Sequence, residues 1–148
     1  MPTDLPRRIA ETMLSQEGTG PWLGIVIDEV REGYARLRMT VMETMLNGHG
    51  TAHGGILFTL ADTAFAYACN SRNVVTVAAQ ASIAFLSPAR LGEILIAEAT
   101  EHCREGRSGT YGVKVHTADG RAVADFLGLS RSLGGTILPP ETEGQDHG

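Results

Sequence analysis

Apolar residues recur at helical spacing in two segments of this chain. Residues 6–16 place Ile9, Met13 and Leu14 on one side, which predicts a short amphipathic helix. From residue 55 to 71 nearly every position is apolar, which predicts a helix buried on almost all sides. We therefore expect the second helix to be enclosed by the rest of the fold.

Most of the remaining chain reads as strands, because its residues are β-branched or alternate between apolar and polar. The predicted strands are residues 23–30, 34–41, 74–86, 93–103, 110–118 and 122–132. Turn signals separate them, and GTGP at 18–21 predicts a turn after the first helix. Strands cluster after the central helix instead of alternating with helices, which disfavours a doubly wound parallel sheet. The pattern predicts an α+β fold in which an antiparallel sheet curls round one long helix.

The length of 148 residues suits one domain, which we place at residues 1–138. Residues 139–148 are polar and begin with two prolines, so we expect a mobile tail. The net charge of −5 and the scattered arginines argue against nucleic-acid binding. The sequence has neither a signal peptide nor a membrane-spanning run, so we expect a cytoplasmic protein. Cys69 and Cys103 lack metal-site spacing, and Cys69 suits core packing.

The start of the central helix is a candidate site for negative charge. A helix presents its first N–H groups without partners, and its dipole is positive at that end. Gly54 and Gly55 have no Cβ, so a substrate can approach the Gly54 N–H as an oxyanion donor. Asn47 and His53 lie just upstream and could orient water or a carbonyl group. The alternative is an ordinary glycine turn with a loop histidine.

Asp62 is the one carboxylate in this apolar helix. Burying a carboxylate costs free energy unless it is hydrogen-bonded or reaches a polar cavity. Desolvation raises the pKa of such a group and suits it to act as a general base or nucleophile. The structural alternatives are a hydrogen bond to Thr63 or to backbone, a solvated gap, or a polar group in an interface.

Spacing constrains how Gly54 and Asp62 could act together. They are eight residues apart, which is roughly 12 Å along a helix axis. An oxyanion donor and its base must both lie within about 3 Å of the reacting atoms. One helix cannot achieve this, whereas two antiparallel helices can. We therefore expect any site that uses both residues to lie across a two-fold dimer interface.

The segment LNGHGTAHGGILFTLADTAFAYACNS, residues 46–71, resembles the bacterial phenylacetate-degradation thioesterases of the hotdog-fold acyl-CoA thioesterase superfamily. The resemblance implies a central helix wrapped by a five- or six-stranded antiparallel sheet. It also implies a homodimer or homotetramer with shared sites. By this resemblance Gly54 polarises the thioester carbonyl, and Asp62 from the partner's helix is the base or nucleophile. Asn47 and His53 help to hold the water and the carbonyl.

The sequence departs from the family pattern where substrate contacts are expected. Ala84 stands where a polar or acidic residue is common, and Ser87 stands where a basic residue often precedes the proline. A serine or threonine that contacts the water in some members is replaced by Ala78 and Ala79. The remaining candidates for substrate binding are Gly55, Thr63 and Phe58, with Arg107, Ser108 and Arg90 as candidates for CoA contacts. The alternative for these last three is an ordinary solvated surface. Phe58, Phe65 and Tyr67 suit the core better than the acyl pocket.

The predicted function is hydrolysis of an aromatic acyl-CoA, such as phenylacetyl-CoA or a hydroxylated relative, to free acid and CoA. Water could attack with Asp62 as base, or Asp62 could attack to form an anhydride. A thioester is already activated, so we expect no metal and no redox cofactor. The alternatives are an enoyl-thioester hydratase and a non-catalytic acyl-CoA-binding protein.

Overall fold

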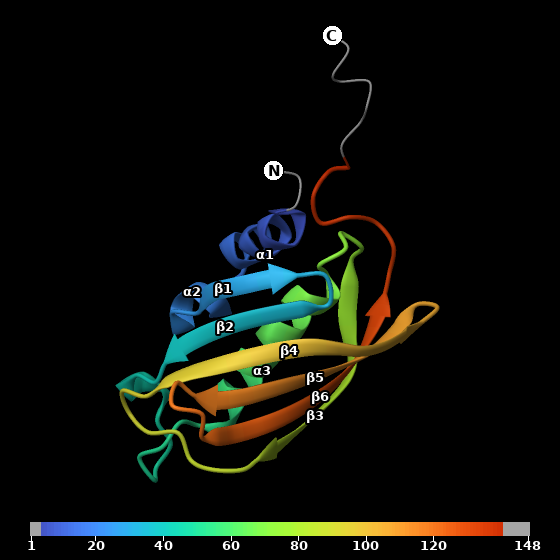
Figure 1. The fold of residues 1–148 in the computed structure, drawn as a ribbon. Coiled ribbons are helices and arrows are strands. Elements are labelled where there is room, and N and C mark those ends of the chain that lie inside the picture. Colours follow the sequence, from blue (N-terminus) through green and yellow to red (C-terminus); the bar gives the residue numbers. More distant parts are fainter. Residues whose placement is uncertain (1–3, 141–148) are drawn as a thin grey trace.

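The computed structural model describes residues 4–140, so residues 141–148 of the predicted tail lie outside the described residues. A six-stranded antiparallel sheet curls round one long helix, α3 (Gly54–Cys69), in Figure 1. The strands are β1 (Val26–Arg31), β2 (Tyr34–Thr40), β3 (Thr76–Phe85), β4 (Ile94–Glu105), β5 (Ser108–Thr117) and β6 (Ala122–Ser132). Their order across the sheet is β1-β2-β4-β5-β6-β3. The predicted α+β class, the antiparallel sheet and the enclosed helix are confirmed.

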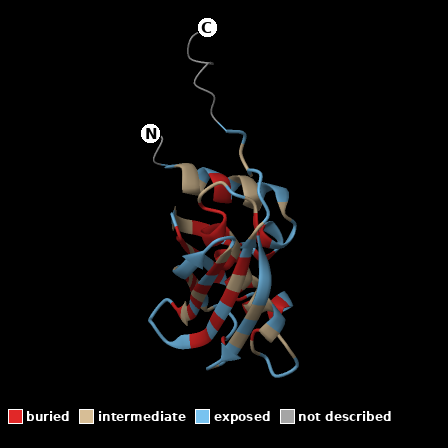
Figure 2. Ribbon diagram, turned by 90° about the vertical axis from the view of Figure 1, so that its right-hand side faces the viewer, coloured by how far each residue is buried: buried red, intermediate tan, exposed pale blue. Residues whose placement is uncertain are grey.

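The core lies between α3 and the concave face of the sheet. Buried and exposed residues alternate along β2 and β5, as their sequences predicted, and Figure 2 shows the resulting bands. Phe65 of α3 is 1% exposed, and its ring centroid lies 5.4 Å from that of Tyr111 and 5.7 Å from that of Phe126. Tyr67 and Cys69 are buried as well, and burial raises the pKa of the Cys69 thiol to about 12. These side chains belong to the core, as expected.

A glycine in β6 brings the sheet close to the helix. A Cβ at Gly128 would lie 2.8–2.9 Å from three atoms of the Phe65 ring. The rings on either side hold Phe65 in place, so the glycine is required by this approach rather than by its backbone angles.

The chain before β1 differs from the prediction. Helix α1 (Leu5–Gln16) is confirmed, but GTGP forms most of a second helix, α2 (Thr19–Leu23), instead of a turn. Pro21 is tolerated there because it lies in the first helical turn, where no N–H partner is needed. Gly24 ends α2 with a left-handed backbone at φ 69°, so the strand begins at Val26 and not at residue 23.

The two edges of the sheet differ in how they are covered. At one edge β1 packs against α1, whereas β3 at the other edge has β6 as its one strand neighbour among residues 4–140 (Figure 1). Most residues of β3 are exposed on both faces. The backbone of β3 is therefore open to pairing along its free side.

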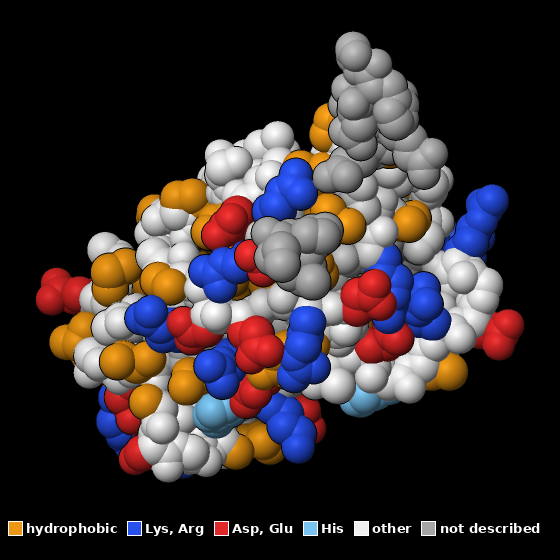
Figure 3. All heavy atoms as spheres, turned by 45° about the horizontal axis from the view of Figure 1, so that its top comes forward, with side chains coloured by type: hydrophobic (Ala, Val, Ile, Leu, Met, Phe, Trp, Pro, Cys, Tyr) orange, Lys and Arg blue, Asp and Glu red, His pale blue; other side chains and the backbone are white. Residues whose placement is uncertain are grey.

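The outer face of the sheet carries charges of alternating sign. Glu29, Arg36, Glu98, Lys114 and Asp125 are successive cross-strand partners from β1 to β6. Figure 3 shows Lys, Arg, Asp and Glu side chains interspersed over one face of the molecule.

No helix within residues 4–140 is long and apolar enough to cross a membrane.

Candidate active site at the start of α3

A cleft of about 380 Å³ lies at the N-terminal end of α3. Three segments that are distant in sequence form it: the loop before α3, the first turn of α3 and the segment after β3. Backbone bridges from Leu46 to Ala52 and from Thr51 to Arg90 hold the loop in place. The lining residues are Asn47, Thr51, Ala52, Gly54, Leu57, Phe85, Leu86, Ser87 and Pro88.

Asn47 holds the loop with one end of its amide and offers the other end to the cleft. Its Oδ1 accepts hydrogen bonds from the backbone N–H of His49 at 2.9 Å and of Thr51 at 3.1 Å. These donors fix the orientation of the amide. The Nδ2 group of Asn47 finds no acceptor among residues 4–140 and is the polar end available to a ligand.

His53 is the N-cap of α3. Its Nδ1 accepts the N–H of Gly55 at 2.9 Å. Because Nδ1 is engaged as the acceptor in this cap, Nε2 is the ring nitrogen left to contact a ligand. The N–H of Gly55 is engaged in the cap, whereas that of Gly54 has no hydrogen-bond acceptor in the described chain. Of the two predicted glycines, only Gly54 has a free donor.

Asp62 lies two turns further along α3 and does not line this cleft. Its side chain is half-buried, and burial raises its pKa above the ordinary 3.8. Thr63 donates its hydroxyl to the carbonyl of Thr59 at 2.7 Å, so it is not the partner of Asp62. Within residues 4–140 no hydrogen bond or ion pair compensates Asp62. One chain therefore brings Asn47, His53 and Gly54 together but leaves Asp62 apart.

Arg107 and Ser108 lie at the other end of the molecule. They line a cavity of about 50 Å³ together with Cys69, the last residue of α3. The 16 residues of α3 span roughly 24 Å, so the two are far from Gly54 of the same chain. Phe58 is half-buried and packs edge-on against Phe126 at 5.3 Å between centroids.

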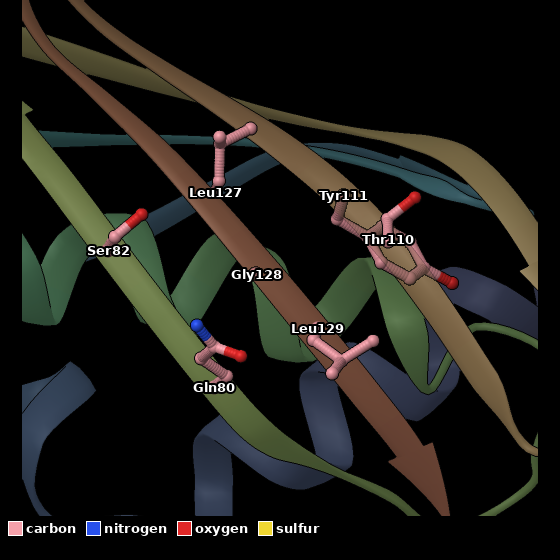
Figure 4. A pocket seen from close by; sticks show the side chains of 7 residues that line it. All are labelled: Gln80, Ser82, Thr110, Tyr111, Leu127, Gly128 and Leu129. Carbon is pink, nitrogen blue, oxygen red and sulfur yellow. The ribbon is translucent and has the colours of Figure 1, made fainter.

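A second hollow of about 330 Å³ opens on the outer face of the sheet, over β3, β5 and β6 (Figure 4). None of the residues predicted for the site lines it. Its lining residues are Gln80, Ser82, Thr110, Tyr111, Leu127, Gly128 and Leu129.

Comparison with known proteins places this geometry in a family. Residues 49–124 match the model of the thioesterase superfamily. The acyl-coenzyme A thioesterase PaaI of Escherichia coli is 43% identical over 128 residues, which cover 86% of this chain and 91% of that protein.

The chain belongs to the thioesterase superfamily. The predicted family, its hotdog fold and the class of thioester hydrolase are thereby confirmed. The structure of E. coli PaaI, from the phenylacetic acid degradation operon, superposes with a TM-score of 0.88 at 40% identity, covering 90% of this chain and 97% of that chain. A hypothetical thioesterase of Streptococcus pneumoniae, solved with coenzyme A, gives 0.73 at 26% identity, covering 76% and 90%.

Of the nine residues that line this thioesterase cleft, Asn47 and Gly54 were predicted for the site and the other seven were not. Phe85 places its ring beside Gly54. The sequence feature that could have indicated Phe85 is the alternation of apolar residues along β3, which continues beyond the residues that pack on the core. Arg121, in the ADGR turn, donates to the carbonyl of Pro88 at 2.8 Å and to both carboxylate oxygens of Glu93. These hydrogen bonds lower the pKa of Glu93 and fix the segment that forms one wall of the cleft.

Proposed function

We propose that the protein hydrolyses acyl-CoA thioesters and that the Gly54 N–H is the oxyanion donor. The observation that carries the proposal is a free N–H at the positive end of α3, inside a cleft that Asn47 also lines. A carbonyl oxygen bound there gains negative charge during attack, and a preorganised donor stabilises that charge. The Nδ2 of Asn47 and the Nε2–H of His53 are the further donors that could hold the carbonyl or the attacking water.

Asp62 of the partner subunit completes this proposed site. Within one chain the rise of α3 separates Gly54 and Asp62 by roughly 12 Å. Two observations support a partner: Thr59, Asp62 and Ala66 form a partly buried stripe on α3, and β3 is an open edge. The partner's carboxylate either deprotonates the attacking water or attacks the carbonyl carbon itself to form an anhydride, which water then cleaves to the free acid and the carboxylate. In both routes CoA leaves as the thiol after proton transfer. Oxygen-18 from labelled water appearing in Asp62 during a single turnover would indicate the anhydride route.

An aromatic acyl group is the substrate we propose, phenylacetyl or a hydroxylated relative. The E. coli relative comes from a phenylacetic acid degradation operon, which supports this choice. The apolar wall of the cleft, formed by Leu57, Phe85 and Leu86, suits a hydrocarbon group. For the CoA phosphates, Arg90 lies next to the cleft through its backbone bridge to Thr51, whereas Arg107 and Ser108 would have to come from another subunit.

The role of the Gly54 N–H can be tested by comparing two substitutions. Proline is accepted at the first residue of a helix, and His53 has the extended backbone that precedes proline, with ψ at 137°. Gly54→Pro therefore removes the N–H and keeps the helix, while Gly54→Ala adds the same Cβ and keeps the N–H. Relative to Gly54→Ala, we expect Gly54→Pro to lower kcat for thiol release by about 10²–10³.

The assay uses a panel of acyl-CoAs and detects the released thiol, with thermal melting to confirm that both variants are folded. Equal rates for the two variants would remove Gly54 from the mechanism. If the wild type released thiol from none of the acyl-CoAs in the panel, the proposed function would be overturned.

A further inference from the structure

Phe85 is an exposed aromatic ring held against the proposed oxyanion donor. Its side chain is 55% exposed at the end of β3. The position of a Cβ at residue 54 would lie 3.0 Å from Cζ and 3.3 Å from Cε1 of this ring. The ring thus occupies the space beside Gly54 that any other residue would fill.

The register of β3 puts the ring there. Ala81 and Ile83 precede Phe85 on the same face of the strand and pack against the core. Pairing with β6 continues to the end of the strand, where Phe85 lies opposite Ala124. The ring lies beside Gly54, the first residue of α3, and the core does not cover it. Strand pairing therefore fixes the position of Phe85 while more than half of its surface stays available.

The cleft has a polar side and an apolar side. Phe85 belongs to the apolar side and lies beside Gly54. Asn47 and Thr51 form the polar side, and Leu57, Phe85 and Leu86 form the apolar side. A thioester whose carbonyl oxygen reaches the Gly54 N–H has its hydrocarbon within reach of the neighbouring ring.

We infer that Phe85 is a specificity-determining residue, whose ring forms the wall against which the acyl group packs. The inference rests on the proposed function and adds a residue that selects aromatic acyl groups. Ring-to-ring packing contributes beyond the burial of area, so the ring should favour an aromatic acyl group over an aliphatic one by about 2- to 10-fold.

The experiment measures kcat and KM for phenylacetyl-CoA and hexanoyl-CoA with the wild type, Phe85→Leu and Phe85→Tyr. Leucine keeps the apolar bulk without the ring, and tyrosine keeps the ring. Trp22→Leu is the matched control, because Trp22 is an aromatic residue of similar exposure, 62%, that does not line the cleft. Thermal melting checks that each variant is folded.

We expect Phe85→Leu to lower the phenylacetyl-to-hexanoyl ratio of kcat/KM by about 2- to 10-fold. Phe85→Tyr and Trp22→Leu should keep the ratio of the wild type. An unchanged ratio in Phe85→Leu would overturn the inference, whichever substrate the wild type prefers. An equal rise in KM for both substrates would overturn it too, since the ring would then contact the shared pantetheine arm. A wild type inactive on both substrates would instead refute the proposed function, and this inference with it.

Discussion

At the residue scale, Asn47 in the cleft and His53 at the adjoining N-cap of α3 serve structure with one atom and leave another for chemistry. Asn47 binds the loop through Oδ1, and His53 caps α3 through Nδ1. Each bond fixes the orientation of the free nitrogen, Nδ2 or Nε2. Replacing either residue would therefore disturb the helix start as well as remove a donor. Substitution at Asp62 avoids this complication, because no described residue depends on its carboxylate.

Asp62→Asn should separate catalysis from binding and from stability. If the carboxylate is the base, thiol release falls by about 10²–10⁴ while calorimetry still detects CoA binding. A non-catalytic binder would have no thiol release to lose. In the wild type, burial raises the pKa of Asp62, so its protonated form favours folding below the ordinary value of 3.8 and this contribution is lost as pH rises through the raised value.

The melting temperature of Asp62→Asn should therefore exceed that of the wild type by more at pH 7 than at pH 4. If the difference in melting temperature between Asp62→Asn and the wild type were the same at both pH values, it would contradict a desolvated Asp62.

At the scale of elements, periodicity predicted the helices and strands whose burial is regular. The two-residue alternation of β2 and the apolar length of α3 were sufficient, because each has one environment along its length. Helix α2 escaped prediction, since glycine and proline residues that usually mark turns here sit at its caps and first turn. Phe85 escaped as well, because its exposure depends on where α3 starts beneath β3, a tertiary relation absent from local pattern.

The contact between β6 and α3 gives a prediction at this scale. Gly128→Ala places a methyl group within 2.8–2.9 Å of the Phe65 ring, which its aromatic neighbours hold in position. We expect a loss of about 1–3 kcal/mol in the free energy of unfolding, measured with urea. Gly18→Ala is the control, because no atom lies within 4 Å of the new methyl group. Equal stability of the two variants would show that the helix can move away from the sheet without cost.

At the scale of the whole molecule, the separation of Gly54 from Asp62 makes the proposed site a property of two chains. The sequence supports this arrangement through the rise of the helix between the two residues alone. The pairing of subunits that we propose would use surfaces that the fold of one chain leaves uncovered. The partly buried stripe of α3 and the free side of β3 are the surfaces proposed for it.

Mixing two inactive chains tests the shared site directly. Gly54→Pro and Asp62→Asn chains, exchanged at equal concentration, form mixed dimers that hold one intact site and one doubly altered site. Half of the dimers are mixed, so we expect about one quarter of the wild-type activity to return. Mass spectrometry verifies the exchange. Absence of rescue in verified mixed dimers would show that each chain acts alone.

The free side of β3 also bears on the fate of a single chain. Its unpaired amide and carbonyl groups can bind any extended polypeptide, whether an identical copy or a foreign segment. Productive association and aggregation would then compete for the same atoms. A newly made chain at low abundance would face that competition longest, which makes the rate of its synthesis a determinant of its yield.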